Sequence, residues 1–148
     1  MKFGYRRYHV QLEHEKLHVV YRPAIPITIH AGGSRVERFA LVDTGADLTV
    51  IPGEIASFLG IVPDRDKAIA MSGVEDAILS ASPADVELEL SRGRDVYRWR
   101  TRVYVADQQY VLLGTEGFLE YFVATFDWSA KTLEIMPSRG YEAVSTLL

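Results

Sequence analysis

The chain has 148 residues, 48% of them hydrophobic and 24% charged, which is typical of one globular domain and excludes a disordered segment. The net charge is −4 with both signs interspersed, which argues against nucleic-acid and membrane partners, and the lack of cysteine excludes disulfides, thiol catalysis and cysteine-ligated zinc. No apolar run approaches the roughly 20 residues of a membrane span, and the first residues lead into no apolar leader, so we expect a soluble, cytoplasmic protein.

The first half of the chain predicts short strands and one helix. Residues 8–21 alternate in places and indicate two strands around a turn at 13–16. A strand over 25–29 and a return strand over 36–42 flank the hairpin signal Gly32-Gly33-Ser34. A strand over 48–51 then precedes a short helix that begins near Pro52 and ends at Leu59.

The second half continues the β pattern. Strands are predicted over 67–71, 77–81, 85–90 and 96–105. A short apolar run over 111–113 is stopped by Gly114, and a hairpin follows over 123–127 and 132–136. Thr115 is a suitable N-cap for a second helix that reaches about Phe122. No low-complexity linker interrupts the chain, so we expect a single domain over residues 24–137, with an N-terminal β extension over 1–23 and a C-terminal tail over 138–148.

One carboxylate occupies an unusual place. Asp43 begins the turn Asp43-Thr44-Gly45, which lies between two apolar runs that have strand character. An unpaired buried charge is costly, so an acid held there is either paired or used. Gly45 permits a tight turn, and the Thr44 hydroxyl can brace it. We interpret Asp43 as catalytic; the alternative is a carboxylate that only caps backbone N–H groups.

A single carboxylate can do little hydrolytic chemistry. Two carboxylates about 3 Å apart share one proton, so that one can accept a proton from water while the other donates to a carbonyl oxygen. The chain contains one Asp-Thr-Gly. The second carboxylate must therefore be Asp43 of another copy, related by a two-fold axis.

Residues 40–52, 71–78 and 111–122, in this order, resemble the retropepsin-like aspartic proteases, and more closely their small stand-alone bacterial members. The resemblance implies an all-β fold, a closed barrel with one or two short helices, assembled as a two-fold homodimer. It implies an aspartic endopeptidase that uses no cofactor and no metal, acts on an extended peptide or protein substrate, and has its protease domain over residues 24–137.

The resemblance also assigns roles by position. Asp43, Thr44 and Gly45 form the catalytic set, with Thr44 bonded across the dimer axis. Gly45 and Asp47 bind the backbone of the substrate. The side-chain pockets are lined by Leu48, Val50, Tyr110 and Leu112, and the flap over the substrate is formed by Met71, Ser72, Gly73 and Val74.

Two features leave alternatives open. The family often has an arginine after the apolar-apolar-Gly motif, paired with the acid at the Asp47 position, whereas this chain has Thr115. That pairing is absent or is made by another arginine, and its absence motivates the alternative of a catalytically weak peptide-binding or dimerisation module. Whether residues 1–22 or 138–148 form a dimer sheet, as the termini of the viral enzymes do, is also open.

A third hypothesis is a zinc hydrolase, because residues 14–18 match the pattern H-E-x-x-H. That pattern binds zinc on a helix. The flanking residues favour strands, in which His14 and His18 would lie about 13 Å apart, too far to share one ion. We therefore expect no metal site there.

Overall fold

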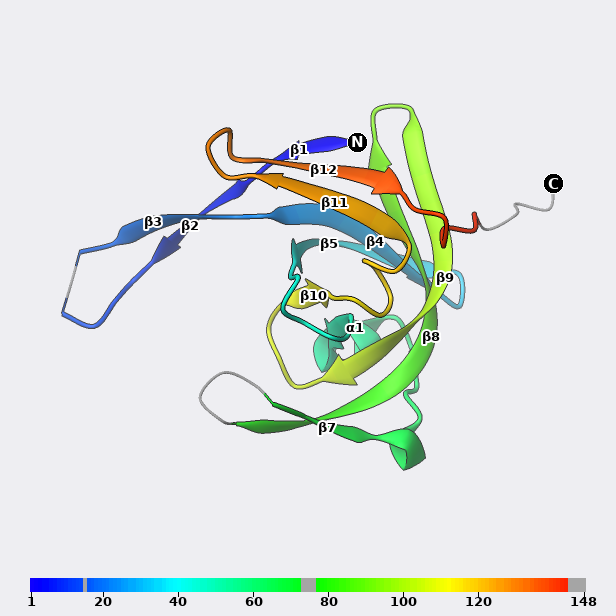
Figure 1. Cartoon of the computed structure of the whole chain (residues 1–148). Helices are drawn as coiled ribbons and strands as arrows, with labels where there is room; N and C mark the ends of the chain where they lie inside the picture. The colour runs from blue at the N-terminus through cyan, green and yellow to red at the C-terminus, as the bar shows by residue number, and fades with distance from the viewer. Residues whose placement is uncertain (15, 73–76, 144–148) are drawn as a thin grey trace.

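Six strands of the computed structural model, which describes residues 1–14, 16–72 and 77–143, close into a barrel (Figure 1). Around the ring they are β4 (Ala24–Ala31), β5 (Ser34–Val42), β10 (Val111–Leu113), β6 (Val50–Pro52), β9 (Asp95–Ala106) and β8 (Ile78–Arg92). The ring is closed by pairing of β4 with β8, where Ile29 lies opposite Leu88. The expected closed all-β barrel is confirmed.

The other strands lie outside the ring. β7 (Ile69–Ser72) pairs antiparallel with the first residues of β8 and forms a ribbon with it. β1 (Lys2–Gly4), β12 (Thr132–Pro137) and β11 (Phe122–Asp127) form a three-stranded sheet in that order. β2 (Arg6–Val10) and β3 (His18–Arg22) form a hairpin that projects from the barrel (Figure 1).

The first predicted helix is confirmed as α1 (Gly53–Phe58), which follows Pro52 directly. Gly60 follows its C-cap with φ +67°, a left-handed conformation that glycine adopts without strain. A short 3₁₀ helix, η1 (Arg65–Lys67), comes next. None of the helices in the described part of the chain has the length and apolarity that a membrane crossing requires.

The barrel interior is apolar because the strands alternate. Ile25, Ile27 and Ile29 of β4 are all fully buried, as the period of two predicts. Trp99 lies edge-on to Phe122 with ring centroids 4.7 Å apart, and its indole N–H donates to the carbonyl of Gly117 at 3.0 Å. This core gives the site a rigid support.

The helix predicted over 115–122 is wrong: the structure has consecutive turns there. The backbone N–H groups of Thr115 and Glu116 bond to the carbonyls of Ala46 and Asp47, both at 2.9 Å. Gly117 then adopts φ +97°. This segment therefore uses these N–H groups to hold the loop around Asp43, and the conformation of Gly117 interrupts the right-handed backbone that a helix requires.

The strands predicted over 77–81 and 85–90 are one strand, β8, although it contains Pro83. β7 pairs with β8 up to Ala81, and β4 pairs with it from Glu87, so no strand pairs with this edge at Pro83. The carbonyl of Pro83 points to that edge, where it accepts from Asp64 N at 2.9 Å. The nitrogen of Pro83 faces the same edge, so its lack of an N–H removes no hydrogen bond between strands.

Candidate active site

Asp43 stands at the end of β5, on a turn fixed by both neighbouring strands. The backbone N–H of Val42 donates to the carbonyl of Pro23 at 2.9 Å, and that of Asp43 donates to the carbonyl of Leu113 at 3.0 Å. β10 runs parallel to β5, with Leu113 opposite Val42. The predicted catalytic carboxylate therefore projects from a supported backbone.

The Asp43 carboxylate is oriented by its own turn. Its Oδ1 accepts from the N–H of Gly45 at 2.9 Å, and a Cβ added at Gly45 would lie 3.3 Å from that oxygen. Asp43 is half-buried, whereas Thr44 and Gly45 are exposed. Among the described residues no cation forms an ion pair with Asp43. The carboxylate is held in place and remains accessible to a second group.

The turn Asp43–Gly45, called the acid turn, is joined to the Leu-Leu-Gly motif (Leu112–Gly114) by a contact between Thr49 and Gly114. The N–H of Gly114 donates to the Thr49 hydroxyl at 3.2 Å, and Thr49 is 1% exposed. A Cβ added at Gly114 would lie 2.3 Å from the carbonyl oxygen of Leu48, so only glycine fits. Thr49 was not among the predicted site residues. A hydroxyl inside an otherwise apolar run was the signal that could have identified it.

Four predicted substrate-binding residues come together beside this turn. Leu48, Met71 and Leu112 pack against a small buried cluster that contains Val50. The other members of this apolar cluster are Ala81, Tyr104 and Ala106. The cluster draws on five strands and lies next to the acid turn, since Leu112 pairs with both Leu41 and Val50. The sequence did not indicate its β8 and β9 members.

The remaining predicted site residues lie apart from the apolar cluster. Tyr110 is 54% exposed and lines a separate depression with Tyr8 and Phe39. Ser72 is exposed at the end of β7. Gly73 and Val74 lie outside the described residues.

Asp47 is exposed and lines a depression of about 590 Å³ that is also lined by Arg102 and Asp85. The Arg102 Nε lies 3.6 Å from Asp85 Oδ1. Thr115 lines the same depression. An arginine from β9 is thus brought near Asp47, at a position that the sequence alone could not reveal.

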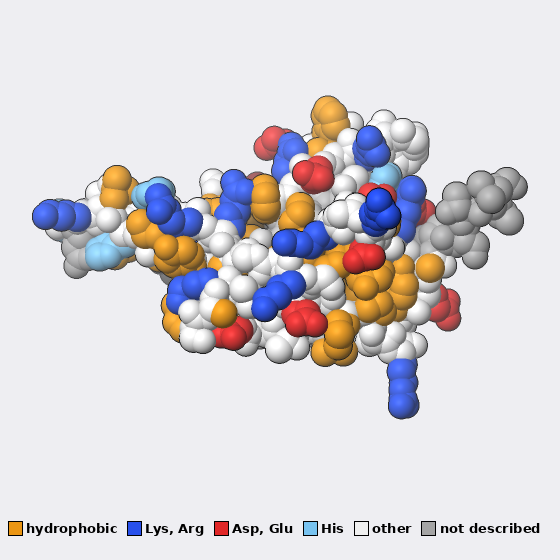
Figure 2. All heavy atoms as spheres, turned by 90° about the horizontal axis from the view of Figure 1, so that it is seen from above, with side chains coloured by type: hydrophobic (Ala, Val, Ile, Leu, Met, Phe, Trp, Pro, Cys, Tyr) orange, Lys and Arg blue, Asp and Glu red, His pale blue; other side chains and the backbone are white. Residues whose placement is uncertain are grey.

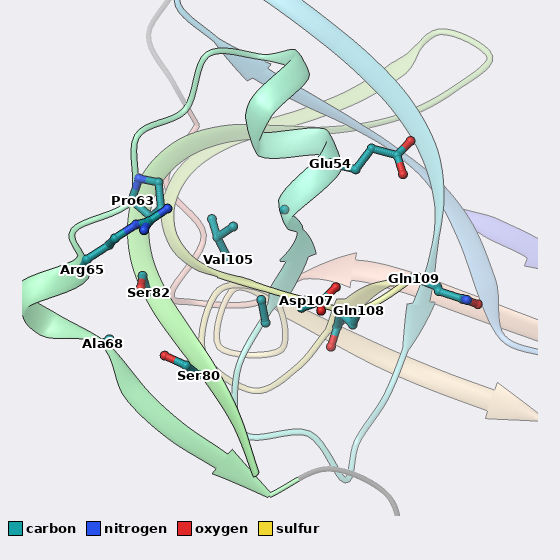
Figure 3. A pocket seen from close by; sticks show the side chains of 12 residues that line it. Glu54, Pro63, Arg65, Ala68, Ser80, Ser82, Val105, Asp107, Gln108 and Gln109 are labelled. Carbon is teal, nitrogen blue, oxygen red and sulfur yellow. The ribbon is translucent and has the colours of Figure 1, made fainter. Parts of the chain in front are cut away.

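Another depression, of about 930 Å³, is lined by none of the predicted site residues. Ser80 and Ser82 line it from β8, alternating with Ala81, which belongs to the apolar cluster. Figure 3 shows Glu54 pointing away from these two serines. Ala106 of the apolar cluster also lines this depression, so the two adjoin at that residue.

The strands predicted for residues 8–21 are confirmed, and they separate the two histidines of the H-E-x-x-H pattern. His18 begins β3, and His14 lies in the hairpin turn with φ +64°. Among the described residues no three His, Asp or Glu side chains gather where they could hold a metal ion.

No protein-family model matches this chain, and no curated protein matches it. Solved structures that are similar to it include the following two. The retroviral protease-like domain of Ddi1 from Leishmania major matches with 18% identity and a TM-score of 0.54, over 77% of this chain and 87% of that one. The EIAV protease complexed with the inhibitor HBY-793 has 22% identity and a TM-score of 0.44, over 72% of this chain and 88% of that one. The fold is retropepsin-like.

Proposed function

We propose that this protein is a homodimeric aspartic endopeptidase of the stand-alone retropepsin-like type. One observation carries the proposal: a supported, accessible Asp43 stands beside an apolar cluster that contains Leu48, Val50 and Leu112. Catalytic carboxylates require this combination of a fixed position and a neighbouring substrate pocket. The retropepsin-like fold supports the same conclusion.

The chemistry requires two chains, because each supplies one Asp43. With the two carboxylates adjacent, one is protonated and the other ionised. The ionised group accepts a proton from water, whose oxygen attacks the peptide carbonyl carbon, while the protonated group donates to the carbonyl oxygen. Collapse of the tetrahedral intermediate then breaks the C–N bond, and a proton passes to the leaving amine.

The substrate is proposed to bind as an extended strand. Backbone hydrogen bonds would supply affinity, and alternate side chains would enter pockets. The apolar cluster of Leu48, Val50, Met71 and Leu112 would accept an aliphatic or aromatic side chain of the peptide. We infer no cofactor.

The test is cleavage of a diverse peptide library across pH 3 to 7, the range in which a carboxylate pair reaches its half-protonated state. Asp43→Asn should lower the rate at least about 100-fold, because it removes the acid–base pair. Asp107→Asn, in an exposed loop, is the matched control and should leave the rate unchanged.

Two outcomes decide between the alternatives. Full cleavage by the Asp43→Asn protein would contradict the proposal. A folded wild-type dimer that binds peptides without cleaving them would favour the peptide-binding module instead.

A further inference from the structure

The β2–β3 hairpin is a two-stranded sheet that pairs with no third strand in the described part of the chain. Isolated two-stranded sheets are at best marginally stable in water. This hairpin, residues 6–22, is called the arm below. Its exposed apolar side chains include Leu12 (45%), Leu17 (60%) and Val19 (45%). An arm of this kind is expected to be covered by another surface.

The direction of the arm follows from strand register. β4 pairs with β5 so that Ala24 lies opposite Leu41, and the carbonyl of Pro23 accepts from Val42 N at 2.9 Å. β3 continues backward from Pro23, whereas β5 ends one residue before Asp43. β3 therefore extends past the acid turn, and its five residues add about 16 Å at ~3.3 Å per residue.

The views agree with this direction. In Figure 1, β3 and β4 form one nearly continuous ribbon, and the arm projects to the left, on the side where the segment between β5 and β6 lies. Figure 2 shows the same projection from above, with basic, histidine and hydrophobic side chains along it.

The base of the arm is fastened to the body by cation–π contacts. The Arg6 guanidinium carbon lies 3.7 Å from the centroid of the Phe39 ring, and the Lys131 ammonium lies 5.7 Å from that of Tyr21. Lys131 also lies 3.8 Å from the ring centroid of Trp128, which is 62% exposed on the body beside the arm. These contacts fix the direction of the arm relative to the barrel, and the exposed ring of Trp128 lies at its base.

We propose that the arm packs against a second copy of this chain and forms part of the dimer interface. The inference rests on the proposed function, since a second Asp43 turn that meets the first at a two-fold axis places the partner subunit on the side toward which the arm projects. The charge of the arm also favours a second copy of this chain as its partner. The arm has four Lys and Arg against two Glu, in a chain of net charge −4, so the remainder of each copy carries −6.

The first experiment measures the dimer dissociation constant by analytical ultracentrifugation. The double variant Leu17→Thr/Val19→Thr keeps strand propensity and removes apolar surface from the arm. We expect at least a tenfold weaker dimer, with the rate per dimer restored at high protein concentration, because neither residue belongs to the candidate active site. Val62→Thr/Val96→Thr, at positions 89% and 54% exposed outside the arm, should leave dimerisation unchanged.

The second experiment locates the arm directly. The chain has no cysteine, so Leu17→Cys introduces a unique attachment point for a maleimide–diazirine cross-linker. In a mixture of isotopically light and heavy copies, photolysis should join light chains to heavy ones. Val62→Cys is the control and should give fewer such links.

A wild type that is monomeric at its highest soluble concentration would overturn both this inference and the proposed function. The inference alone is overturned if the arm variant dimerises like the wild type or if cross-links stay within one chain. These failures differ from failure of the proposed function, which appears as cleavage that survives Asp43→Asn. An Asp43→Asn protein that is inactive but dimeric supports both ideas.

Discussion

The backbone N–H of Gly114 donates to the hydroxyl of Thr49 at 3.2 Å, a bond between residues 65 positions apart in the chain. It lies beneath the acid turn and connects the two segments that hold Asp43. Thr49 N in turn donates to the carbonyl of Glu116 at 2.9 Å. The position of the carboxylate thus depends on a polar contact inside an apolar environment, where an unpaired donor is costly.

The hydroxyl of Thr49 can be tested without changing its shape. Thr49→Val leaves Gly114 N unsatisfied and should lower the free energy of unfolding by about 1–3 kcal/mol. Thr49→Ser keeps the hydroxyl and should cost less. Urea denaturation monitored by tryptophan fluorescence measures both. A larger loss for Thr49→Ser than for Thr49→Val would show that the methyl group, and not the hydrogen bond, is what matters.

Gly114→Ala should be the more damaging change in the same contact. The new Cβ would lie 2.3 Å from the Leu48 carbonyl oxygen, so the backbone must shift, at a cost of about 3 kcal/mol or more. Gly4→Ala is the control, because nothing lies within 4 Å of a Cβ at that position. Thermal unfolding of the two variants compares them. A Gly114→Ala protein as stable as the control would contradict this packing.

Arg102 is predicted to assist peptide binding through Asp47. Arg102→Ala should raise KM for a peptide substrate several-fold with a smaller effect on kcat, because the loss concerns binding and not the reacting carboxylates. Arg100→Ala removes an exposed arginine two residues away on the same strand and should leave KM unchanged. Initial-rate kinetics at fixed dimer concentration check this. An equal effect of both variants would point to charge alone.

Acid stability should depend on Asp127. The N–H of Ala130 at 2.9 Å and the hydroxyl of Ser129 at 2.7 Å, both on Oδ1, lower the pKa of this carboxyl. A lowered folded-state pKa contributes stability above the unfolded pKa of about 3.9, and this is lost as pH falls through the folded value. Asp127→Asn should therefore be less stable than the wild type at pH 7, with a smaller difference near pH 2.

Urea midpoints at the two pH values measure this effect. Ser129→Ala removes one of the two bonds and should show part of the same pattern. A deficit for Asp127→Asn that is equal at both pH values would argue against the titration of Asp127 as its cause.

Local sequence signals predicted most of the strands. Gly32-Gly33 marked the β4–β5 hairpin, and both glycines have positive φ, which their lack of a side chain permits. Alternation marked β4, and the apolar run before Gly114 marked β10. These signals depend on nearest neighbours along the chain, so they can be read from sequence.

The failures involve contacts between distant segments. The helix expected from Thr115 does not form, because Gly117 adopts φ +97° where it packs closely against Thr49 and the backbone of Arg102. The place of Arg102 near Asp47 depends on how β9 crosses the barrel, which no local pattern encodes. Likewise, Tyr104 and Ala81 join the apolar cluster only through strand pairing. The site could be predicted where one loop makes it and not where several strands meet.

The insertion of β10 between β5 and β6 has a consequence for synthesis. A growing chain makes Asp43 early, but the strand that supports its turn comes about seventy residues later, at Val111–Leu113. The acid turn therefore stays unsupported until the ribosome has made and released β10. Under the proposed function, the carboxylate therefore gains its supported position only after residues 111–113 have been added to the chain and have paired with β5 and β6.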